Sequence, residues 1–386
     1  MMHTTAAPRG VGAVLRRDPA APWRHLDWPL LGATFAIAGL GCLMVFSATR
    51  VGMADAGLDP YTYLKRQILF LALGTVVMAA VTAIDYRTLR DLAPLGYLAS
   101  LTLLVLVLTP LGTSVNAAQS WFALGAFQLQ PAEFTKLALI VVLAAVCAPA
   151  RGHLDRHRLG VCLALVGAPA ALILLQPDMG STLVLVAIGL AVVVVAGARP
   201  RELAVLAAAG IIAVVALFQL DMVDAYQRDR LTEFARDGRG SVTGAGFQAS
   251  QAKTAIGAGG LFGAGLYDGT QTKLGFVPEQ QTDFIFTVVG EELGFVGSAT
   301  LLALYSVVAW RVWRAAQVAR DLFGTLVCVG VLGMLVFQVF ENLGMSMGIM
   351  PITGLPLPLL SYGGSSMVTS LAAVGLVLNV HMRRFS

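Results

Sequence analysis

Three carboxylates, Asp283, Glu291 and Glu292, lie at or just inside the start of one apolar segment in the last third of the chain. Residues 277–293 read V-P-E-Q-Q-T-D-F-I-F-T-V-V-G-E-E-L, so Asp283 lies where a polar stretch gives way to an apolar one. A charged group inside a bilayer costs from about 2.5 to more than 10 kcal/mol, which makes such acids functional candidates. Asp283 is either a reactive carboxylate acting as a general base or the N-cap of its helix. Glu291 and Glu292, two turns deeper, are expected to pair with neighbouring helices.

Further charged residues could join Asp283. Glu133 and Lys136 are three residues apart and would face the same way on a helix. They form either a plain ion pair or a site in which Lys136 contacts a diphosphate and Glu133 orients it or holds a metal ion. Asp178, in Q-P-D-M-G-S-T, either caps the helix that follows or acts at the site. Four cations of the polar stretch are either solvated or bind phosphates: Arg228, Arg230, Lys253 and Lys273.

Several kinds of chemistry are excluded. The five histidines fall in the tails or in one short loop on the opposite side, so no Ser-His-Asp or H-E-x-x-H site can form near Asp283. A general base there must be a carboxylate. No phosphate-binding G-x-x-x-x-G-K-[ST] motif is present, and the glycines at 257–265 lack the strand that a dinucleotide site needs. The four cysteines lie in apolar stretches without C-x-x-C spacing, which predicts packing roles. No nucleotide, haem or nucleic-acid partner is expected.

The elements that position these residues are membrane helices. Of the 386 residues 57% are hydrophobic and 12% charged, against a charged fraction of about 25% in soluble domains. A spanning helix needs about 20 apolar residues. We therefore predict an all-α polytopic membrane protein with ten transmembrane helices, at 28–48, 65–84, 92–110, 133–150, 159–175, 181–198, 203–220, 283–310, 322–346 and 362–381.

Arginines indicate the topology, because positive residues mark the cytoplasmic side of short loops. They place both termini in the cytoplasm, with residues 1–27 as a disordered basic tail. The long loop 221–282, between helices 7 and 8, then lies outside and is expected to be a folded lid with short amphipathic helices on the membrane face. Residues 111–136 are too polar to span. Residues 348–366 are apolar but contain three prolines, and such irregular backbone predicts an outer cavity.

Four motifs together resemble the SEDS family, whose members include RodA, FtsW and SpoVE. They are F-x-P-E-x-x-T-D-F-I-F-x-x-x-x-E-E-L-G-x-x-G at 276–297, Q-P-D-M-G-S-T at 176–182, W-x-x-L-G-x-x-x-x-Q-P-A-E-x-x-K at 121–136 and G-I-x-P-I-T-G-L-P-L-P-L-L-S-Y-G-G-S at 348–365. The resemblance covers residues 28–381. The segment K-x-A-I-G-x-G-G-L-x-G-x-G-x-x-x-G-T-Q at 253–271 is more similar to the RodA branch than to FtsW.

The resemblance implies a peptidoglycan glycosyltransferase that polymerises lipid II during cell-wall elongation, outside the bacterial cytoplasmic membrane. Lipid II, undecaprenyl diphosphate, a class B penicillin-binding transpeptidase and the elongation machinery are the implied partners. A lipid II flippase and a division or sporulation paralogue are the alternatives, with an inactive scaffold as a third class.

The resemblance also implies site residues. The family's essential aspartate matches Asp283, and its fourth-helix motif matches Glu133 and Lys136. Where the family usually has an arginine before the motif tryptophan, this chain has Ser120, so a phosphate contact by that arginine is missing unless Lys136 or a loop arginine replaces it. A divalent cation, magnesium or manganese, could be held by outer carboxylates, with Asp283 as one ligand. Four further substrate-binding candidates lie within the matched motifs: Glu279, Thr282, Ser361 and Tyr362.

Overall fold

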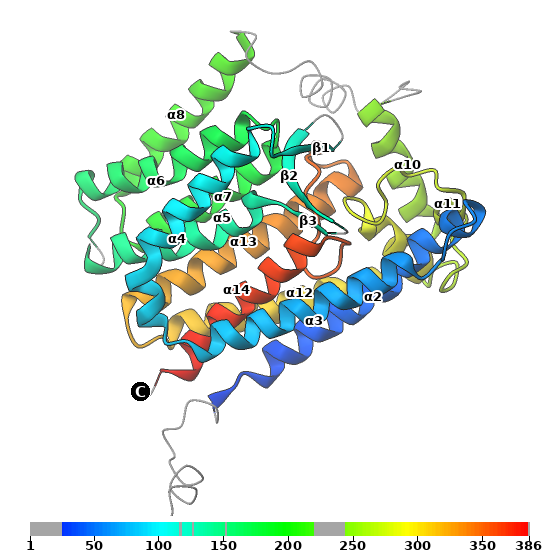
Figure 1. Cartoon of the computed structure of the whole chain (residues 1–386), viewed down its shortest axis with the longest axis horizontal. Coiled ribbons are helices and arrows are strands. Elements are labelled where there is room, and N and C mark those ends of the chain that lie inside the picture. The colour runs from blue at the N-terminus through cyan, green and yellow to red at the C-terminus, as the bar shows by residue number, and fades with distance from the viewer. Residues whose placement is uncertain (1–24, 116–117, 126, 151–152, 220–243, 385–386) are drawn as a thin grey trace, which may run out of the picture.

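The computed structural model describes residues 25–115, 118–125, 127–150, 153–219 and 244–384. Within these ranges, eight helices are long and apolar enough to cross a membrane. They run side by side as one bundle (Figure 1). They are α2 (Trp28–Asp55), α3 (Thr62–Ala83), α4 (Tyr86–Val107), α5 (Pro131–Cys147, continued to Ala150 by a 3-10 turn), α6 (Arg156–Leu174), α12 (Ile285–Gln317), α13 (Leu322–Met347) and α14 (Gly364–Met382). The chain is therefore a multi-pass membrane protein.

Two further predicted spans coincide with helices outside this set of eight. The stretch 181–198 corresponds to α7 (Met179–Val195), whose 17 residues fall short of the usual spanning length. The stretch 203–220 corresponds to α8 (Pro200–Gln219). The count of ten transmembrane helices thus stays a prediction, while the eight others overlap their predicted positions, with ends that differ by up to seven residues.

Aspartate side chains fix where several helices begin. Each accepts a hydrogen bond from a main-chain N–H of the first turn, which would otherwise lack a partner. Asp27 accepts from Leu30 at the start of α2, and Asp178 accepts from Ser181 at the start of α7. Asp85 and Asp321 act in the same way for α4 and α13. These caps set the helix boundaries more sharply than hydropathy does.

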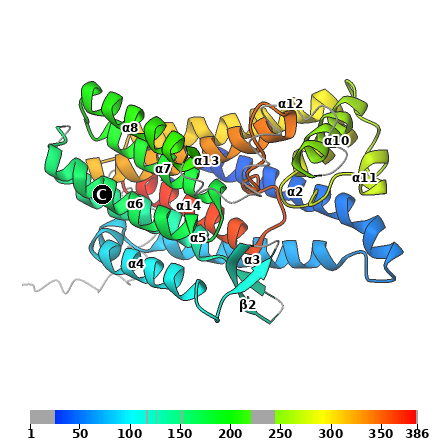
Figure 2. The same ribbon diagram turned by 90° about the horizontal axis from the view of Figure 1, so that it is seen from above.

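The core of the bundle is built around α14. This helix is buried along its length and packs against α3, α5 and α13 (Figure 2). Its sequence S-L-A-A-V-G-L is rich in small residues, which let neighbouring backbones approach. A Cβ at Gly375 would stand 2.8 Å from the main-chain oxygen of Met78 on α3. α14 therefore holds the loop that precedes it, 348–363, at a fixed place in the bundle.

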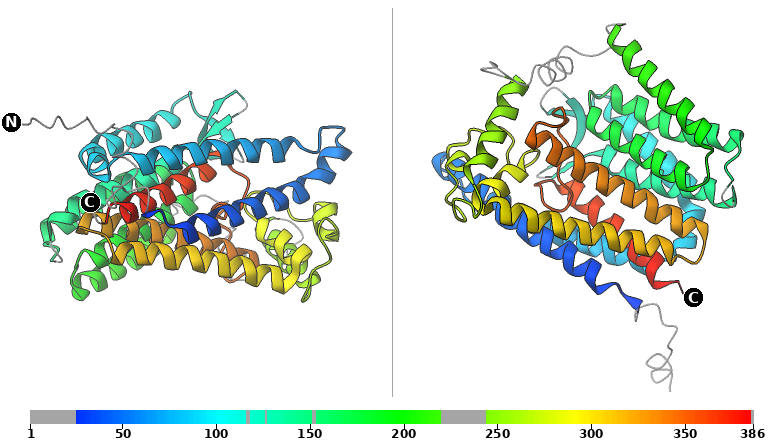
Figure 3. Two further views of the ribbon diagram at one scale, coloured as in Figure 1. Left: turned by 90° about the horizontal axis from the view of Figure 1, so that it is seen from below. Right: turned by 180° about the vertical axis from the view of Figure 1, so that it is seen from behind.

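The two ends of the bundle differ in structure. The start of α2 and the end of α14 lie at one end (Figure 1), where Arg311 pairs with Asp27 at 2.7 Å. The helices α10 (Gly244–Ala258) and α11 (Thr270–Leu274) lie at the other end (Figure 3). Both belong to the long loop, which was expected to contain short helices. The membrane side that each end faces stays a prediction.

The description as all-α is wrong for residues 113–129, which form a small antiparallel sheet. Its strands are β1 (Thr113–Val115), β2 (Ala118–Leu124) and β3 (Phe127–Leu129), in the order β1-β2-β3. Thr113 pairs with Trp121, and Phe122 pairs with Leu129. The segment was expected only to be too polar to span. The outer strands have three residues each, too few for an alternating pattern to be recognised in the sequence.

α12 is broken at Gly294, in the half of the helix that lies next to α10 and α11. This residue has φ 65° and ψ −160°, a conformation open essentially only to glycine. The break removes main-chain hydrogen bonds of the helix, and the glycine-dense run of the long loop supplies substitutes. Four bonds do so: Phe295 N donates to Gly260 O (3.0 Å), Val296 N to Leu261 O (3.1 Å), Ala264 N to Glu291 O (2.9 Å) and Gly265 N to Glu292 O (3.2 Å). The loop and the helix therefore form one hydrogen-bonded unit.

We predict that Gly294→Ala destabilises the protein. A Cβ there would stand 2.3 Å from the main-chain nitrogen of Gly263, and the backbone conformation would be strained. The expected cost is roughly 1–3 kcal/mol, seen as a lower unfolding temperature in detergent. Gly39→Ala in α2 is the matched control, because its Cβ would meet nothing within 4 Å. Equal unfolding temperatures for the two variants would contradict the assigned break.

Candidate active site

The loop 348–363, between α13 and α14, joins several of the predicted site segments. Asn342 on α13 donates from its Nδ2 to the main-chain oxygens of Asp283 and Leu355, each at 2.7 Å. Tyr362 N donates to Gln281 O at 2.9 Å. The turn that carries Asp283 is thus held on two sides, by α13 and by this loop.

Asp283 lies in that turn and is half-buried. α12 begins at Ile285 with Phe284 at the N-cap position, so Asp283 is not the N-cap of α12. The carbonyl of Glu279 accepts hydrogen bonds from Thr282 N (3.2 Å) and Asp283 N (3.1 Å). Glu279 has a positive φ of 50° and an exposed side chain. Two further predicted residues, Glu279 and Thr282, therefore accompany Asp283 at the start of α12.

Asp178 caps α7 and is also tied to α5. Its carboxylate accepts from Ser181 N at 2.9 Å and from Gln130 Nε2 at 3.2 Å. The adjacent Gly180 packs closely on the loop 348–363, because a Cβ there would lie 2.9 Å from Thr353 O. Capping, one of the two roles considered for Asp178, is therefore present. The same contacts also bring Asp178 to the loop that holds the Asp283 turn.

Position 120, where the family usually has arginine, lies beside the turn that carries Asp178. Ser120 is buried in β2, and its hydroxyl donates to Gln176 O at 3.4 Å. Gln176 lies two residues before Asp178. The sheet therefore brings residue 120 beside the Asp178 turn, where this chain has a neutral side chain.

Glu133 and Lys136 form a buried ion pair on α5. Lys136 Nζ donates to Glu133 Oε1 at 2.7 Å, and the two side chains are 0% and 3% exposed, respectively. This is the intrahelical pair named as one alternative. The start of the helix is linked to α14, because Gln130 N donates to Ser365 Oγ at 3.0 Å. In this conformation, Lys136 could reach a diphosphate only after an opening next to α5.

Ser361 and Tyr362 have different environments. The Ser361 hydroxyl accepts from Leu357 N at 2.8 Å and so stabilises the turn of its own loop. The Tyr362 ring packs edge-on against Tyr63, with ring centroids 4.9 Å apart. Burial raises the pKa of the Tyr362 hydroxyl, and the neighbouring Arg66 acts in the opposite direction. Arg66 in α3 is not among the predicted site residues, yet it lies beside the loop that holds the Asp283 turn.

The described cations of the long loop differ in their surroundings. Lys273 pairs with Asp268 at 2.8 Å, and both side chains are exposed. Lys253 lies against the end of α13, where a Cβ at Gly348 would stand 2.5 Å from its Nζ. Arg228 and Arg230 lie outside the described residues.

The two acids inside α12 have separate partners. Glu292 accepts from the Ser47 hydroxyl on α2 and from Tyr267 N at 3.1 Å. Glu291 accepts from main-chain and side-chain groups of α11. A neighbouring membrane helix is thus a partner of Glu292, whereas Glu291 is bound by the loop. Glu341, a buried acid next to Asn342 in α13, was not predicted as a site residue. A carboxylate inside an apolar segment could have indicated it.

The described residues do not form a metal site of their own. Among them, no three His, Cys, Asp or Glu side chains are grouped so that they could hold a metal ion. Magnesium bound at Asp283 would need most of its ligands from water and substrate oxygens.

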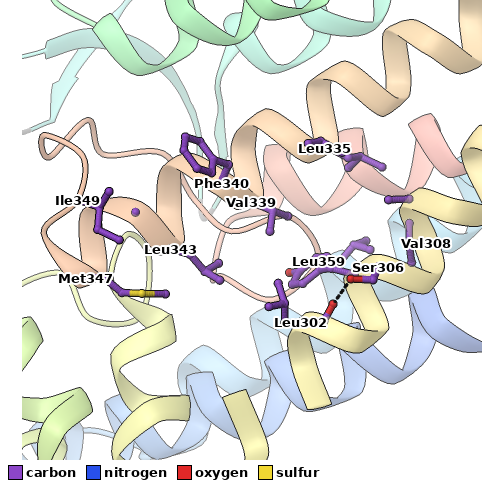
Figure 4. A pocket seen from close by; sticks show the side chains of 14 residues that line it. Leu302, Ser306, Val308, Leu335, Val339, Phe340, Leu343, Met347, Ile349 and Leu359 are labelled. Carbon is purple, nitrogen blue, oxygen red and sulfur yellow. Dashed lines mark hydrogen bonds between the residues drawn. The ribbon is translucent and has the colours of Figure 1, made fainter. Parts of the chain in front are cut away.

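A separate hollow of about 340 Å³ lies between α12 and α13 (Figure 4). It is lined mainly by apolar side chains, among them Leu302, Leu335, Val339, Phe340, Leu343 and Met347. A sugar or diphosphate would find few hydrogen-bond partners there. The hollow suits hydrocarbon, and the polar chemistry belongs to the Asp283 turn and its neighbours.

Fold and site together define a multi-pass membrane protein with a cluster of polar side chains around an irregular loop at one end of its bundle. Residues 29–385 match the family model of FtsW, RodA and SpoVE, described as cell cycle protein. The chain belongs to this family, the SEDS family.

Characterised relatives match over nearly the whole chain. Stage V sporulation protein E of Bacillus subtilis is 39% identical over 92% of this chain and 96% of its own length. A probable peptidoglycan glycosyltransferase FtsW of Thioalkalivibrio sulfidiphilus is 41% identical over 93% and 90%. The Thermus thermophilus rod shape determining protein RodA superposes with a TM-score of 0.70, at 35% identity over 94% of this chain and 99% of that one. A chain from a peptidoglycan synthase complex that coordinates polymerization and crosslinking gives 0.79, at 36% identity and the same coverage.

We predict that replacing one member of the buried ion pair destabilises the protein more than replacing both. Lys136→Met leaves the Glu133 carboxylate buried without its cation, which costs about 3–5 kcal/mol. The double variant Glu133→Gln with Lys136→Met should recover most of this loss, as measured by thermal unfolding in detergent. If the single and double variants unfold at the same temperature, the pair is not stabilised as described.

Proposed function

We propose that the chain is a peptidoglycan glycosyltransferase that polymerises lipid II into β-1,4-linked glycan strands. One observation supports this most: a half-buried carboxylate, Asp283, stands in a turn whose main chain is held by Asn342 and Tyr362. A general base needs a fixed position next to its substrate hydroxyl. The relatives named as peptidoglycan glycosyltransferases give the substrate class.

In the proposed reaction, Asp283 removes the proton from the 4-hydroxyl of the incoming N-acetylglucosamine. The oxygen attacks C1 of the lipid-linked muramic acid at the end of the growing strand. The new C–O bond forms as the bond from C1 to the diphosphate breaks, and undecaprenyl diphosphate leaves with the electron pair. Because an α linkage becomes β, a single displacement with inversion is sufficient, and one base is enough.

The leaving diphosphate requires positive charge nearby. Lys136 is proposed to supply it once substrate binding opens the region next to α5, helped by cations of the long loop. Arg66 is a further source, since it lies beside Tyr362 in the loop that holds the Asp283 turn. Glu133 would then orient Lys136, and Asp178 would fix the start of α7. Neither of these two acids would bind the sugar.

The proposed orientation places both termini in the cytoplasm and the Asp283 turn outside, in a bacterial cytoplasmic membrane. The distribution of arginines supports it. Lipid II carries its sugars on the outer face before polymerisation. The long loop with α10 and α11 lies at the Asp283 end of the bundle and would cover those sugars (Figure 3).

A class B penicillin-binding transpeptidase is the proposed partner. Support comes from the solved relative in a complex that coordinates polymerization and crosslinking. A polymerase that works next to a transpeptidase can pass a nascent strand directly to the crosslinking site.

We predict that Asp283→Asn abolishes polymerisation of purified lipid II. Loss of a general base costs typically 10²- to 10⁴-fold in rate. Both proteins are co-purified with the transpeptidase, and moenomycin silences conventional transglycosylases while glycan ladders are measured. Asp59→Asn is the matched control, because this exposed outer carboxylate pairs only at the surface, with Lys65 at 2.6 Å.

The outcomes separate the two main functions. Ladders from the wild type and the control, but not from Asp283→Asn, are expected of a polymerase. Normal ladders from a folded and partnered Asp283→Asn would show that another group is the base. No ladders from any protein, with an active partner and metal supplied, would favour a lipid II flippase.

Elongation is the proposed cellular role, on the resemblance of the segment 253–271 to the RodA branch and the superposition with RodA of Thermus thermophilus. The chain should therefore restore rod shape to cells depleted of their RodA, and should not restore division to cells depleted of FtsW. Cell length and width by microscopy are the readout, with Asp283→Asn as the inactive control. Rescue of division alone would assign the chain to the division branch.

A further inference from the structure

Glu291 is the centre of a buried hydrogen-bond network that the proposed reaction does not use. Its Oε1 accepts from Gln271 N at 2.6 Å, and its Oε2 accepts from Thr272 N at 2.9 Å and from Thr272 Oγ1 at 2.7 Å. These N–H groups belong to the first turn of α11, which no side chain of α11 caps. The Glu291 side chain on α12 therefore caps the N-terminus of α11 in place of a side chain from α11 itself.

The network continues from Thr272 to the residues around Asp283. The Thr272 hydroxyl, while donating to Glu291, accepts from Gln280 Nε2 at 3.2 Å. Gln280 Nε2 also donates to Thr287 Oγ1 at 3.1 Å. The Thr287 hydroxyl in turn donates to Phe284 O at 2.7 Å. The chain of bonds thus reaches the residues on both sides of Asp283.

Burial makes these bonds hard to replace. Thr272 is 4% exposed, Gln280 3%, Thr287 0% and Glu291 1%. Buried polar groups that lose a partner cannot turn to water, so such networks hold one arrangement. The directions of the bonds are also fixed. Main-chain N–H groups of α11 can only donate, so residue 291 must present acceptors on both of its oxygens.

The glycine-dense run allows the carboxylate to reach this position. A Cβ at Gly269 would stand 2.8 Å from the Cδ and Oε2 atoms of Glu291. A Cβ at Gly259 would lie 1.9 Å from Gly290 O. The loop backbone therefore lies directly on α12 where the helix carries Glu291, next to the break at Gly294.

We propose that Glu291 is a positioning residue for Asp283, acting through Thr272, Gln280 and Thr287. Its carboxylate fixes α11, α11 fixes Gln280, and Gln280 fixes the turn that carries Asp283. A shift of the loop is thereby transmitted to the catalytic turn. The inference rests on the proposed role of Asp283 as general base, but the network itself can be tested without it.

The test compares Thr272→Val with Thr272→Ser. Valine keeps the shape but removes the hydroxyl, which breaks the bonds to both Glu291 and Gln280, whereas serine keeps them. The matched control is Thr254→Val in α10, where the hydroxyl donates to Ser250 O of its own helix and is exposed. Each protein, with its transpeptidase partner, is assayed for lipid II polymerisation and for hydrogen–deuterium exchange of peptides spanning 268–287.

We predict that Thr272→Val lowers kcat by roughly 10- to 100-fold, because a displacement of about 1 Å in a catalytic group can have an effect of this size. KM for lipid II should stay nearly unchanged, and exchange should rise in peptides covering 271–284. Thr272→Ser should behave as wild type in all three measurements. Gln280→Met should reproduce the effect, and its combination with Thr272→Val should add little further loss.

Each outcome bears on a different claim. Unchanged exchange and unchanged kcat in both Thr272→Val and Gln280→Met would overturn the network. Raised exchange with normal kcat would show that the bonds hold the loop but do not position the base. If Asp283→Asn polymerises normally while Thr272→Val raises exchange, the assignment of the base has failed and the network has not. Should Thr272→Val not yield monodisperse protein, Gln280→Met alone decides.

Discussion

Main-chain hydrogen bonding at the end of the bundle that carries α10 and α11 is the constraint on which the site depends. Within a bilayer, irregular backbone is stable only where protein or water satisfies its polar groups. Two irregular segments, the break in α12 and the loop 348–363, meet this requirement through hydrogen bonds to neighbouring parts of the chain. The break in α12 is completed by the glycine-dense run of the long loop, and the loop 348–363 is held by Asn342, Gln67 and its own Ser361. Regular helices could not have placed a turn such as that of Asp283 between them.

This arrangement explains why residues far apart in the sequence act as one site. The α12 turn is bound to α13 through Asn342 and to the 348–363 loop through Tyr362. The same loop contacts the start of α7 at Gly180, and α14 contacts the start of α5 through Ser365. The segment 348–365 therefore contacts the elements that carry Asp283, Asp178 and Glu133. The four motifs converge because one of them is this segment and the other three contact it.

The sequence was sufficient for what depends on composition over many residues. Apolar runs located eight spans closely, and a carboxylate at the edge of such a run pointed to Asp283. What was missed depends on single residues or on uncharged groups. The break at Gly294 lies in E-E-L-G-F-V, where no proline marks it and a single glycine is compatible with a continuous helix. Thr272 and Gln280 carry no charge, so nothing in the sequence marks them as a link between the loop and α12. Arg66 belongs to no recognised motif, and only the fold places it beside Tyr362.

The acids of the bundle differ in how their negative charge is balanced, and this bears on which of them can act as a base. Glu133 has Lys136, Asp27 has Arg311, and Glu291 has three hydrogen-bond donors. A deeply buried carboxylate persists only with such partners, and its acceptor positions are then already in use. Asp283 precedes the first turn of α12 and is half-buried, in a turn whose main chain is held by Asn342. A carboxylate that is held in place but not deeply buried can be reached by a substrate hydroxyl, as proton transfer requires.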